Sequence, residues 1–142
     1  MKKKILCGIL CFNNEKVINK LIKDIKLIEK KVDLIFINDH STDKTLEILK
    51  NRKKKIISHK KNLGYGAAVK SAYTHAIKKK YEVLTIFPGD YQRSINDLLK
   101  LIDHQKKKNY DLVSGSKFLA QKKLFIFKKF GNIFFSVFPN FF

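Results

Sequence analysis

Cysteine and acidic residues are scarce in this chain of 142 residues, which has 2 Cys and 12 Asp plus Glu. Cys7 and Cys11 fall in one apolar run, and in a strand they would be too far apart to bridge. Neither a disulfide nor a metal framework is therefore expected. No histidine has ligand spacing to another, and none is assigned to metal binding or catalysis. The histidines are His40, His59, His75 and His104.

A secretory signal is also missing from the start of the sequence. The basic N-terminus leads into an apolar run that Asn13, Asn14 and Glu15 interrupt, and no small-residue cleavage site follows. This start predicts a first strand and a cytoplasmic protein.

The shortage of acid leaves 31 Lys plus Arg and a formal net charge of +19. The positive electrostatic field of so basic a chain attracts ligands that contain phosphate. The lysines fall in short runs between apolar segments, however, and runs of this kind are mostly solvated helix ends and loops. No nucleic-acid recognition motif accompanies them. A basic nucleic-acid-binding domain is therefore kept only as a second alternative, and nucleic acid is not the expected partner.

Short apolar runs alternate with amphipathic segments along the chain. Residues 4–12 form a nearly continuous apolar run, which predicts a strand buried on both faces. From Glu15 onward apolar positions recur at three- and four-residue steps, which predicts a helix. Further strands are predicted at residues 34–37, 55–58, 83–87 and 111–114, and further helices at 45–49, up to about 78, and at 95–105. This alternation predicts one α/β domain, a mostly parallel sheet with helices on both faces.

Polar residues other than lysine gather at the predicted carboxyl ends of the strands. They lie within residues 12–15, 38–43, 62–66 and 88–92. Because open α/β sheets bind ligands at this edge, the site is expected there.

The loop at residues 60–68 contains glycines but matches neither G-x-G-x-x-G after the first strand nor a Walker loop. Two interpretations stay open. Gly64 and Gly66 allow a tight turn and close packing of a small-residue helix on the sheet, or they contact the ligand.

Acidic residues at the predicted strand ends have different expected roles. Asp43 is expected to cap a helix. Asp39 is expected to point into the crevice at this edge, where it could accept hydrogen bonds from a nucleotide base or ribose. Asp90 and Gln92 are spaced to face one cation or diphosphate. The alternative for this last pair is a surface turn built by the preceding proline and glycine.

Five motifs, in order, resemble those of the family 2 glycosyltransferases of the GT-A fold, in the group that includes dolichyl-phosphate mannose and glucose synthases. Residues 10–15 (LCFNNE) look like the family's P-x-Y-N-E-E, and residues 37–45 (INDHSTDKT) look like V-D-D-G-S-x-D-x-T. Residues 62–68 (NLGYGAA) are similar to N-x-G-x-G-x-A. Residues 87–92 (FPGDYQ) occupy the D-x-D-x-Q position, and residues 115–118 (GSKF) the G-S-R-Y/F position.

The resemblance implies a Rossmann-like GT-A domain that transfers a sugar from a nucleotide-diphospho-sugar to an acceptor, with polyprenyl phosphate as a candidate acceptor. It implies that Asp90 and Gln92 bind a divalent cation, Mg²⁺ or Mn²⁺, which bridges the donor diphosphate. The residues that it implies for nucleotide-sugar binding are Phe12, Asn14, Glu15, Asn38, Asp39, Asp90 and Lys117.

Several positions depart from the family pattern. They are Pro88 for the first Asp of D-x-D, Asn38 for the first Asp of V-D-D, Leu10 for the opening Pro, and Lys117 for the Arg of G-S-R. Since a proline ring cannot coordinate a cation, the cation site is expected to be weakened. The cation would then depend on Asp90, Gln92 and the substrate phosphates, or be partly replaced by the positive charge of the lysines. A lysine contact with phosphate should also be less directional than the family's arginine.

Residues 124–142 are rich in Phe and carry Lys128 and Lys129, with Gly131 and Pro139 as interruptions. The segment is too broken for a spanning helix. It suits a segment at the inner face of the cytoplasmic membrane, or a helix that packs on a further domain. The chain is therefore divided into a nucleotide-sugar-binding domain, residues 1–123, and a tail, residues 124–142.

The likeness stops where the family's acceptor-binding segment would begin, so the chain looks cut short and no catalytic residue is assigned. The predicted function is that of a glycosyltransferase of cell-envelope glycan synthesis. The first alternative is a truncated or vestigial protein that binds a nucleotide-sugar without turnover.

Overall fold

The computed structural model describes residues 4–108 and 111–115. Residues up to Asp111 belong to one compact unit, in which strands and helices alternate. The strands are β1 (Ile5–Cys11), β2 (Asp33–Asn38), β3 (Ile56–Ser58) and β4 (Val83–Pro88). The helices are α1 (Glu15–Ile25), α2 (Thr45–Asn51), α3 (Tyr65–Lys78) and α4 (Ile95–Lys108).

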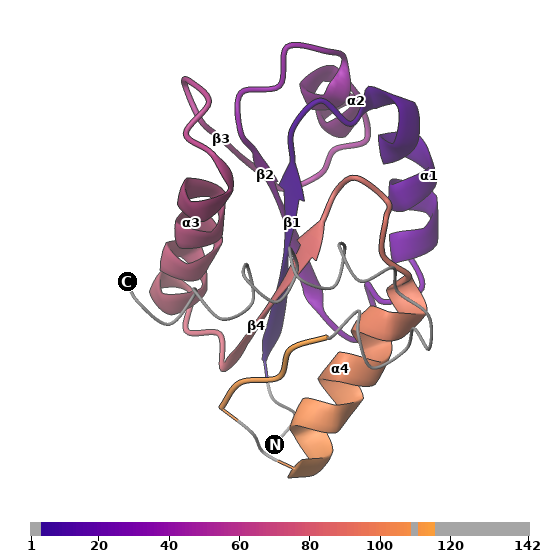
Figure 1. The fold of residues 1–142 in the computed structure, drawn as a ribbon, viewed down its shortest axis with the longest axis vertical. Helices are drawn as coiled ribbons and strands as arrows, with labels where there is room; N and C mark the ends of the chain where they lie inside the picture. Colours follow the sequence, from indigo (N-terminus) through magenta and orange to yellow (C-terminus); the bar gives the residue numbers. More distant parts are fainter. Residues whose placement is uncertain (1–3, 109–110, 116–142) are drawn as a thin grey trace, which may run out of the picture. The chain divides into compact units, whose positions relative to one another are not determined.

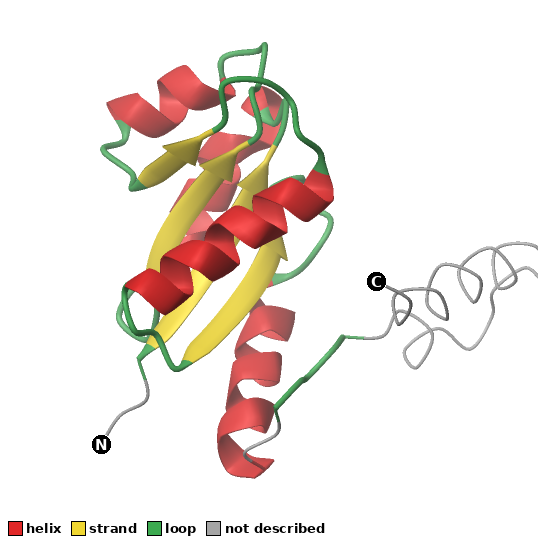
Figure 2. Ribbon diagram, turned by 90° about the vertical axis from the view of Figure 1, so that its left-hand side faces the viewer, coloured by secondary structure: helices red, strands yellow, loops and turns green. Residues whose placement is uncertain are grey.

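The strands form one parallel sheet in the order β3-β2-β1-β4. In its register, Cys11 pairs with Asn38 on one side of β1, and Leu10 pairs with Pro88 on the other. The carboxyl ends of the strands therefore meet at one edge, where the arrowheads of Figure 2 lie. The predicted parallel α/β domain is confirmed.

Alternate residues of the central strand face different helices. Ile5, Cys7 and Ile9 belong to the core shared with α1, α2 and α4, whereas Leu6 and Leu10 pack with the alanines of α3. Figure 1 shows α3 on one side of the sheet and the other three helices on the opposite side. A strand buried on both faces reads as a continuous apolar run, which explains the pattern at the start of the chain.

Helix α3 lies close to the sheet because it presents small residues to it. Ala68, Ala72 and Ala76 are buried at steps of four residues, and a Cβ built on Gly8 would lie 2.8 Å from the Ala72 Cβ. Gly64 adopts φ 84°, so it provides the tight turn. A Cβ on Gly66 would meet no atom within 4 Å. The predicted packing role therefore belongs to Gly8 and not to Gly66.

Gly8→Ala is expected to lower the free energy of unfolding by about 1 to 3 kcal/mol, because the added methyl group overpacks the contact between β1 and α3. Gly66→Ala is the matched control, and it should change stability by less than about 1 kcal/mol or stabilise slightly. Urea denaturation followed by circular dichroism measures both. Equal midpoints for the two variants would show that α3 moves away from the sheet without cost.

The predicted strand at residues 111–114 is wrong. These residues have no strand structure, and Leu112 is 85% exposed. With only Leu112 and Val113 as apolar residues, the segment offers too little surface to bury. Among the described residues, no helix has the length and apolar character needed to cross a bilayer. The tail at residues 124–142 and the domain boundary before it lie outside the described residues and stay predictions.

Candidate functional site

The loops that follow β1 and β2 are bound to each other by side-chain hydrogen bonds. The backbone nitrogen of Asn13 donates to Ser41 Oγ at 3.1 Å, and its side-chain Oδ1 accepts from the backbone nitrogen of Thr42 at 2.8 Å. The Asn14 nitrogen donates to Thr45 Oγ1 at 2.7 Å. These contacts join two segments that lie far apart in the sequence, so that the two loops lie together at the carboxyl edge of the sheet.

The starts of α1 and α2 hold each other through acidic side chains, Asp43 from the loop before α2 and Glu15 from the first turn of α1. Asp43 Oδ2 accepts from the Glu15 nitrogen at 2.9 Å, and Glu15 Oε2 accepts from the Lys44 nitrogen at 2.8 Å. Asp43 Oδ1 also accepts from the Thr45 nitrogen at 2.9 Å. Burial alone would raise the pKa of Asp43, but hydrogen bonds from the Thr45 side chain and from the backbone of Glu15 and Thr45 outweigh it and lower the pKa. The predicted capping role of Asp43 is confirmed and extends to both helices.

Two of the residues implied for nucleotide binding support these loops instead of lining a cavity. The Glu15 carboxylate holds the Lys44 amide, as described above. Asn38 is 1% exposed, and its Nδ2 donates to Ser58 Oγ at 2.9 Å while its Oδ1 accepts from the Ser41 nitrogen at 3.3 Å. Asn38 therefore braces the ends of β2 and β3.

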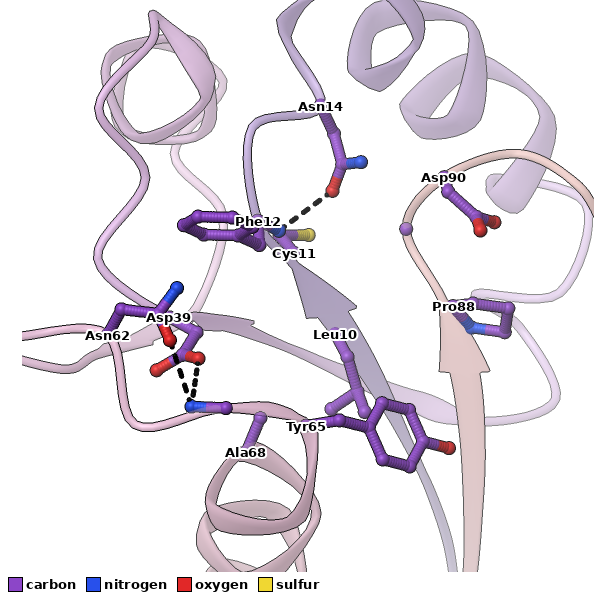
Figure 3. A pocket seen from close by; sticks show the side chains of 12 residues that line it. Leu10, Cys11, Phe12, Asn14, Asp39, Asn62, Tyr65, Ala68, Pro88 and Asp90 are labelled. Atoms are coloured by element: carbon purple, nitrogen blue, oxygen red, sulfur yellow. Dashed lines mark hydrogen bonds between the residues drawn. The ribbon is translucent and has the colours of Figure 1, made fainter. Parts of the chain in front are cut away.

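A pocket of about 330 Å³ lies at the carboxyl edge of the sheet. Four residues implied for nucleotide binding line it, from the ends of three strands: Phe12, Asn14, Asp39 and Asp90. Figure 3 shows these side chains around the pocket, with Pro88 beside Asp90. Phe12 is 47% exposed as a residue, and its ring offers an apolar surface to the pocket. The sequence motifs therefore bring most of the predicted contacts into one cavity.

The loop before α3 and the first turn of that helix form a further wall of the pocket. Asn62 and Tyr65 line it, and the Tyr65 residue is 69% exposed. Sequence analysis left open whether the glycines of this loop contact a ligand, and Gly64 is the one that lines the pocket. Tyr65 was not among the predicted site residues, although its place in the polar segment at residues 62–66, after the third strand, could have indicated it.

Asp39 is buried and holds the loop before α3. Its Oδ1 contacts His59 Nδ1 at 2.6 Å and accepts from the Leu63 nitrogen at 2.9 Å, and its Oδ2 accepts from the Gly64 nitrogen at 2.7 Å. Burial acts to raise the pKa of Asp39, but the bonds from His59, Leu63 and Gly64 prevail and lower it. The carboxylate is therefore ionised and accepts from all three donors.

His59 is the partner that sequence analysis missed, because a histidine without ligand spacing gives no metal signal. Its Nε2 contacts Ser71 Oγ of α3 at 2.8 Å. The signal available was its position: it comes directly after β3, at the edge where the site was expected.

The two residues implied for cation binding do not share the pocket. Asp90 lines it, with Asp90 Oδ1 accepting from the Gln92 nitrogen at 3.0 Å, whereas the Gln92 side chain lines a separate pocket with Asp24 and Tyr91. Tyr91, between them, turns the chain with φ 60°. Within residues 4–108 and 111–115, no group of three or more His, Cys, Asp or Glu side chains could hold a metal ion. The cation site stays a prediction, and Lys117 lies outside the described residues.

Comparison with known proteins identifies relatives of the chain. The model of glycosyl transferase family 2 matches residues 7–141. Two uncharacterised proteins of Methanocaldococcus jannaschii are similar to it: MJ1222, 28% identical over 134 residues, and MJ0544, 30% identical over 133 residues. These matches cover 92% and 89% of this chain but 55% and 56% of the relatives. The chain thus spans about half the length of these relatives.

A solved structure has the same fold at low sequence identity. It is the mannosyltransferase PcManGT from Pyrobaculum calidifontis in complex with GDP-Man and Mn²⁺, with a TM-score of 0.59 and 16% identity over 70% of this chain and 31% of that one. Because the family model matches nearly the whole sequence, the chain belongs to glycosyl transferase family 2 and has the GT-A fold.

Proposed function

We propose that this chain forms the donor-binding part of a glycosyltransferase and holds a nucleotide-diphospho-sugar in the pocket at the carboxyl edge of the sheet. The observation that carries this proposal is that Phe12, Asn14, Asp39 and Asp90 line one cavity. The solved relative supports the ligand class, since it was determined with GDP-Man and Mn²⁺. Family membership supports sugar transfer as the reaction.

In this proposal each wall of the pocket meets a different part of the donor. The apolar face of Phe12 packs on the base. Asp39 accepts a hydrogen bond from the base or ribose through the lone pair of Oδ2 that Gly64 leaves free, since Oδ1 already accepts from His59 and Leu63. Asp90 lies toward the diphosphate. During transfer the bond between the anomeric carbon and the diphosphate oxygen breaks, and an acceptor oxygen bonds to that carbon. No basic side chain is among the residues described as lining the pocket, so the positive net charge of the chain would act on the charge of the leaving diphosphate from a distance.

A divalent cation fits these residues only in part. Asp90 offers one carboxylate to the pocket, Pro88 offers none, and Gln92 lines another pocket. A cation held by Asp90 and the donor phosphates would neutralise charge on the leaving group. Few protein ligands mean a weak site, and we expect affinity for the cation to depend on the nucleotide.

For the acceptor we propose polyprenyl phosphate at the cytoplasmic face of a membrane. The net charge of +19 supports an anionic acceptor and an anionic surface. A binding protein without turnover is the alternative, and donor hydrolysis by this chain would distinguish it from an enzyme.

Isothermal titration of the full chain with GDP and UDP, with and without Mn²⁺, tests the proposed function. We expect binding of at least one nucleotide, strengthened by Mn²⁺. Asp90→Ala should weaken binding in Mn²⁺ by about tenfold or more, the usual loss for a charged contact. Asp97→Ala is the matched control, because Asp97 is exposed on α4 and pairs with Lys100. A folded chain that binds neither nucleotide would contradict the proposal.

A further inference from the structure

A partly buried polar chain starts from Asp39, which lines the pocket, and links three elements. Ser71 of α3 contacts His59, which follows β3, and His59 contacts Asp39, which follows β2. The two distances are 2.8 Å and 2.6 Å. The His59 and Asp39 side chains are 8% and 7% exposed. His59 and Ser71 neither cap a helix nor line the pocket, so their contacts have another role.

The imidazole of His59 has a defined orientation. An ionised carboxylate can only accept hydrogen bonds, so Nδ1 carries a proton toward Asp39. Nε2 then lies against the Ser71 hydroxyl, which can donate to a neutral ring or accept from a protonated one. Ser71 thus orients the ring in either protonation state.

The carboxylate of Asp39 needs such an external constraint. Rotation about the bond to an aspartate carboxylate is broad, so the side chain alone does not fix where its oxygens point. Here donors from His59, Leu63 and Gly64 hold it. The backbone donors belong to the loop before α3, so the position of the carboxylate and the position of this loop are coupled. The charge-assisted bond from His59, which is partly buried, contributes strongly to that geometry.

We propose that His59 is a positioning residue for nucleotide binding, with Ser71 behind it. His59 fixes the Asp39 carboxylate, and through it the loop that brings Asn62 and Tyr65 to the pocket. This inference rests on the proposed function for its ligand, but not for the coupling between His59 and the loop. Neither residue need touch the nucleotide.

Three variants of the full chain test the proposal. His59→Leu removes the donor while filling much of the space, and GDP binding in Mn²⁺ should weaken about tenfold. His59→Asn keeps an amide N–H close to the place of Nδ1, and it should recover most of the affinity. Ser71→Ala should give an intermediate loss. His75→Leu serves as the control, since His75 lies on the same helix but does not line the pocket.

Amide hydrogen exchange provides a readout that does not need the nucleotide. In His59→Leu the Leu63 and Gly64 amides should exchange faster, while the amide of Ile9 in β1 keeps its protection, because the effect is local. If all amides of His59→Leu exchanged faster, the substitution would have lowered the stability of the whole protein, and the positioning role would be overturned. The role would also be overturned if neither amide exchange nor nucleotide affinity changed. If the wild-type chain binds no nucleotide, the proposed function fails, and the role of His59 in nucleotide binding fails with it. The exchange data would then still decide whether His59 fixes the loop.

Discussion

Asp39→Ala is expected to lower the free energy of unfolding by about 2 to 4 kcal/mol and to reduce nucleotide binding below detection. The substitution removes the acceptor of three hydrogen bonds, from His59 Nδ1 and from the Leu63 and Gly64 nitrogens. Donors left without a partner in a partly buried site cost more than the net value of the bonds they made. Urea denaturation and isothermal titration with GDP and Mn²⁺ measure the two effects.

The pH dependence of the same variant provides a second measurement. Because the folded state lowers the pKa of Asp39 below the ordinary value of an aspartate, the folded protein binds this proton more weakly than the unfolded chain. The contribution of Asp39 is complete above the unfolded pKa and is lost as the pH falls through the folded pKa. The stability difference between wild type and Asp39→Ala should therefore be largest near neutral pH and shrink in acid.

Asp97→Ala is again the matched control, and it should leave both stability and binding nearly unchanged. An Asp39→Ala protein that keeps wild-type stability at neutral pH would show that the loop before α3 is held by other contacts. Retained stability with lost binding would instead assign Asp39 to the ligand alone.

The fold was predictable because nearly every element has its own apolar pattern. The apolar run at residues 4–12 is continuous because β1 is buried on both faces. In α1, directly after it, the apolar residues recur every three or four positions, so the two elements are easy to distinguish. The error at residues 111–114 has the opposite cause. Leu112 and Val113 could begin a strand, but pairing depends on a partner strand and on surface to bury, and neither can be read from so short a segment.

The site was predictable in position but not in detail. The rule that ligands bind at the carboxyl ends of parallel strands identified the edge where the pocket lies. A local motif cannot distinguish a polar side chain that faces a ligand from one that binds a backbone amide of another loop. Glu15 holds an amide 29 positions away in the sequence, and His59 contacts a carboxylate 20 positions away. Their partners become visible only in the folded chain.

The close approach of β4 to β1 also could not be read from the sequence, although Gly89 was noted there as a turn residue. The Gly89 nitrogen donates to the Leu10 carbonyl oxygen at 2.7 Å. A Cβ on Gly89 would lie 2.6 Å from that oxygen and 2.9 Å from both Asn14 Oδ1 and Cys11 Sγ. A backbone oxygen cannot rotate away, and Asn14 Oδ1 is itself held by the Phe12 nitrogen at 3.0 Å. The end of β4 must move if any side chain is added.

Gly89→Ala is therefore expected to lower the free energy of unfolding by about 2 to 3 kcal/mol, at the upper end of the range for overpacking. Movement of β4 displaces Pro88 and Asp90, which line the pocket, so nucleotide binding should weaken about tenfold or more even where the protein is folded. Gly66→Ala adds the same methyl group in open space and controls for the change in backbone freedom. Thermal denaturation and titration with GDP and Mn²⁺ provide the comparison. A Gly89→Ala protein that matches Gly66→Ala in both measurements would show that β4 can separate from β1 at little cost, and that the Gly89 end of the pocket does not limit binding.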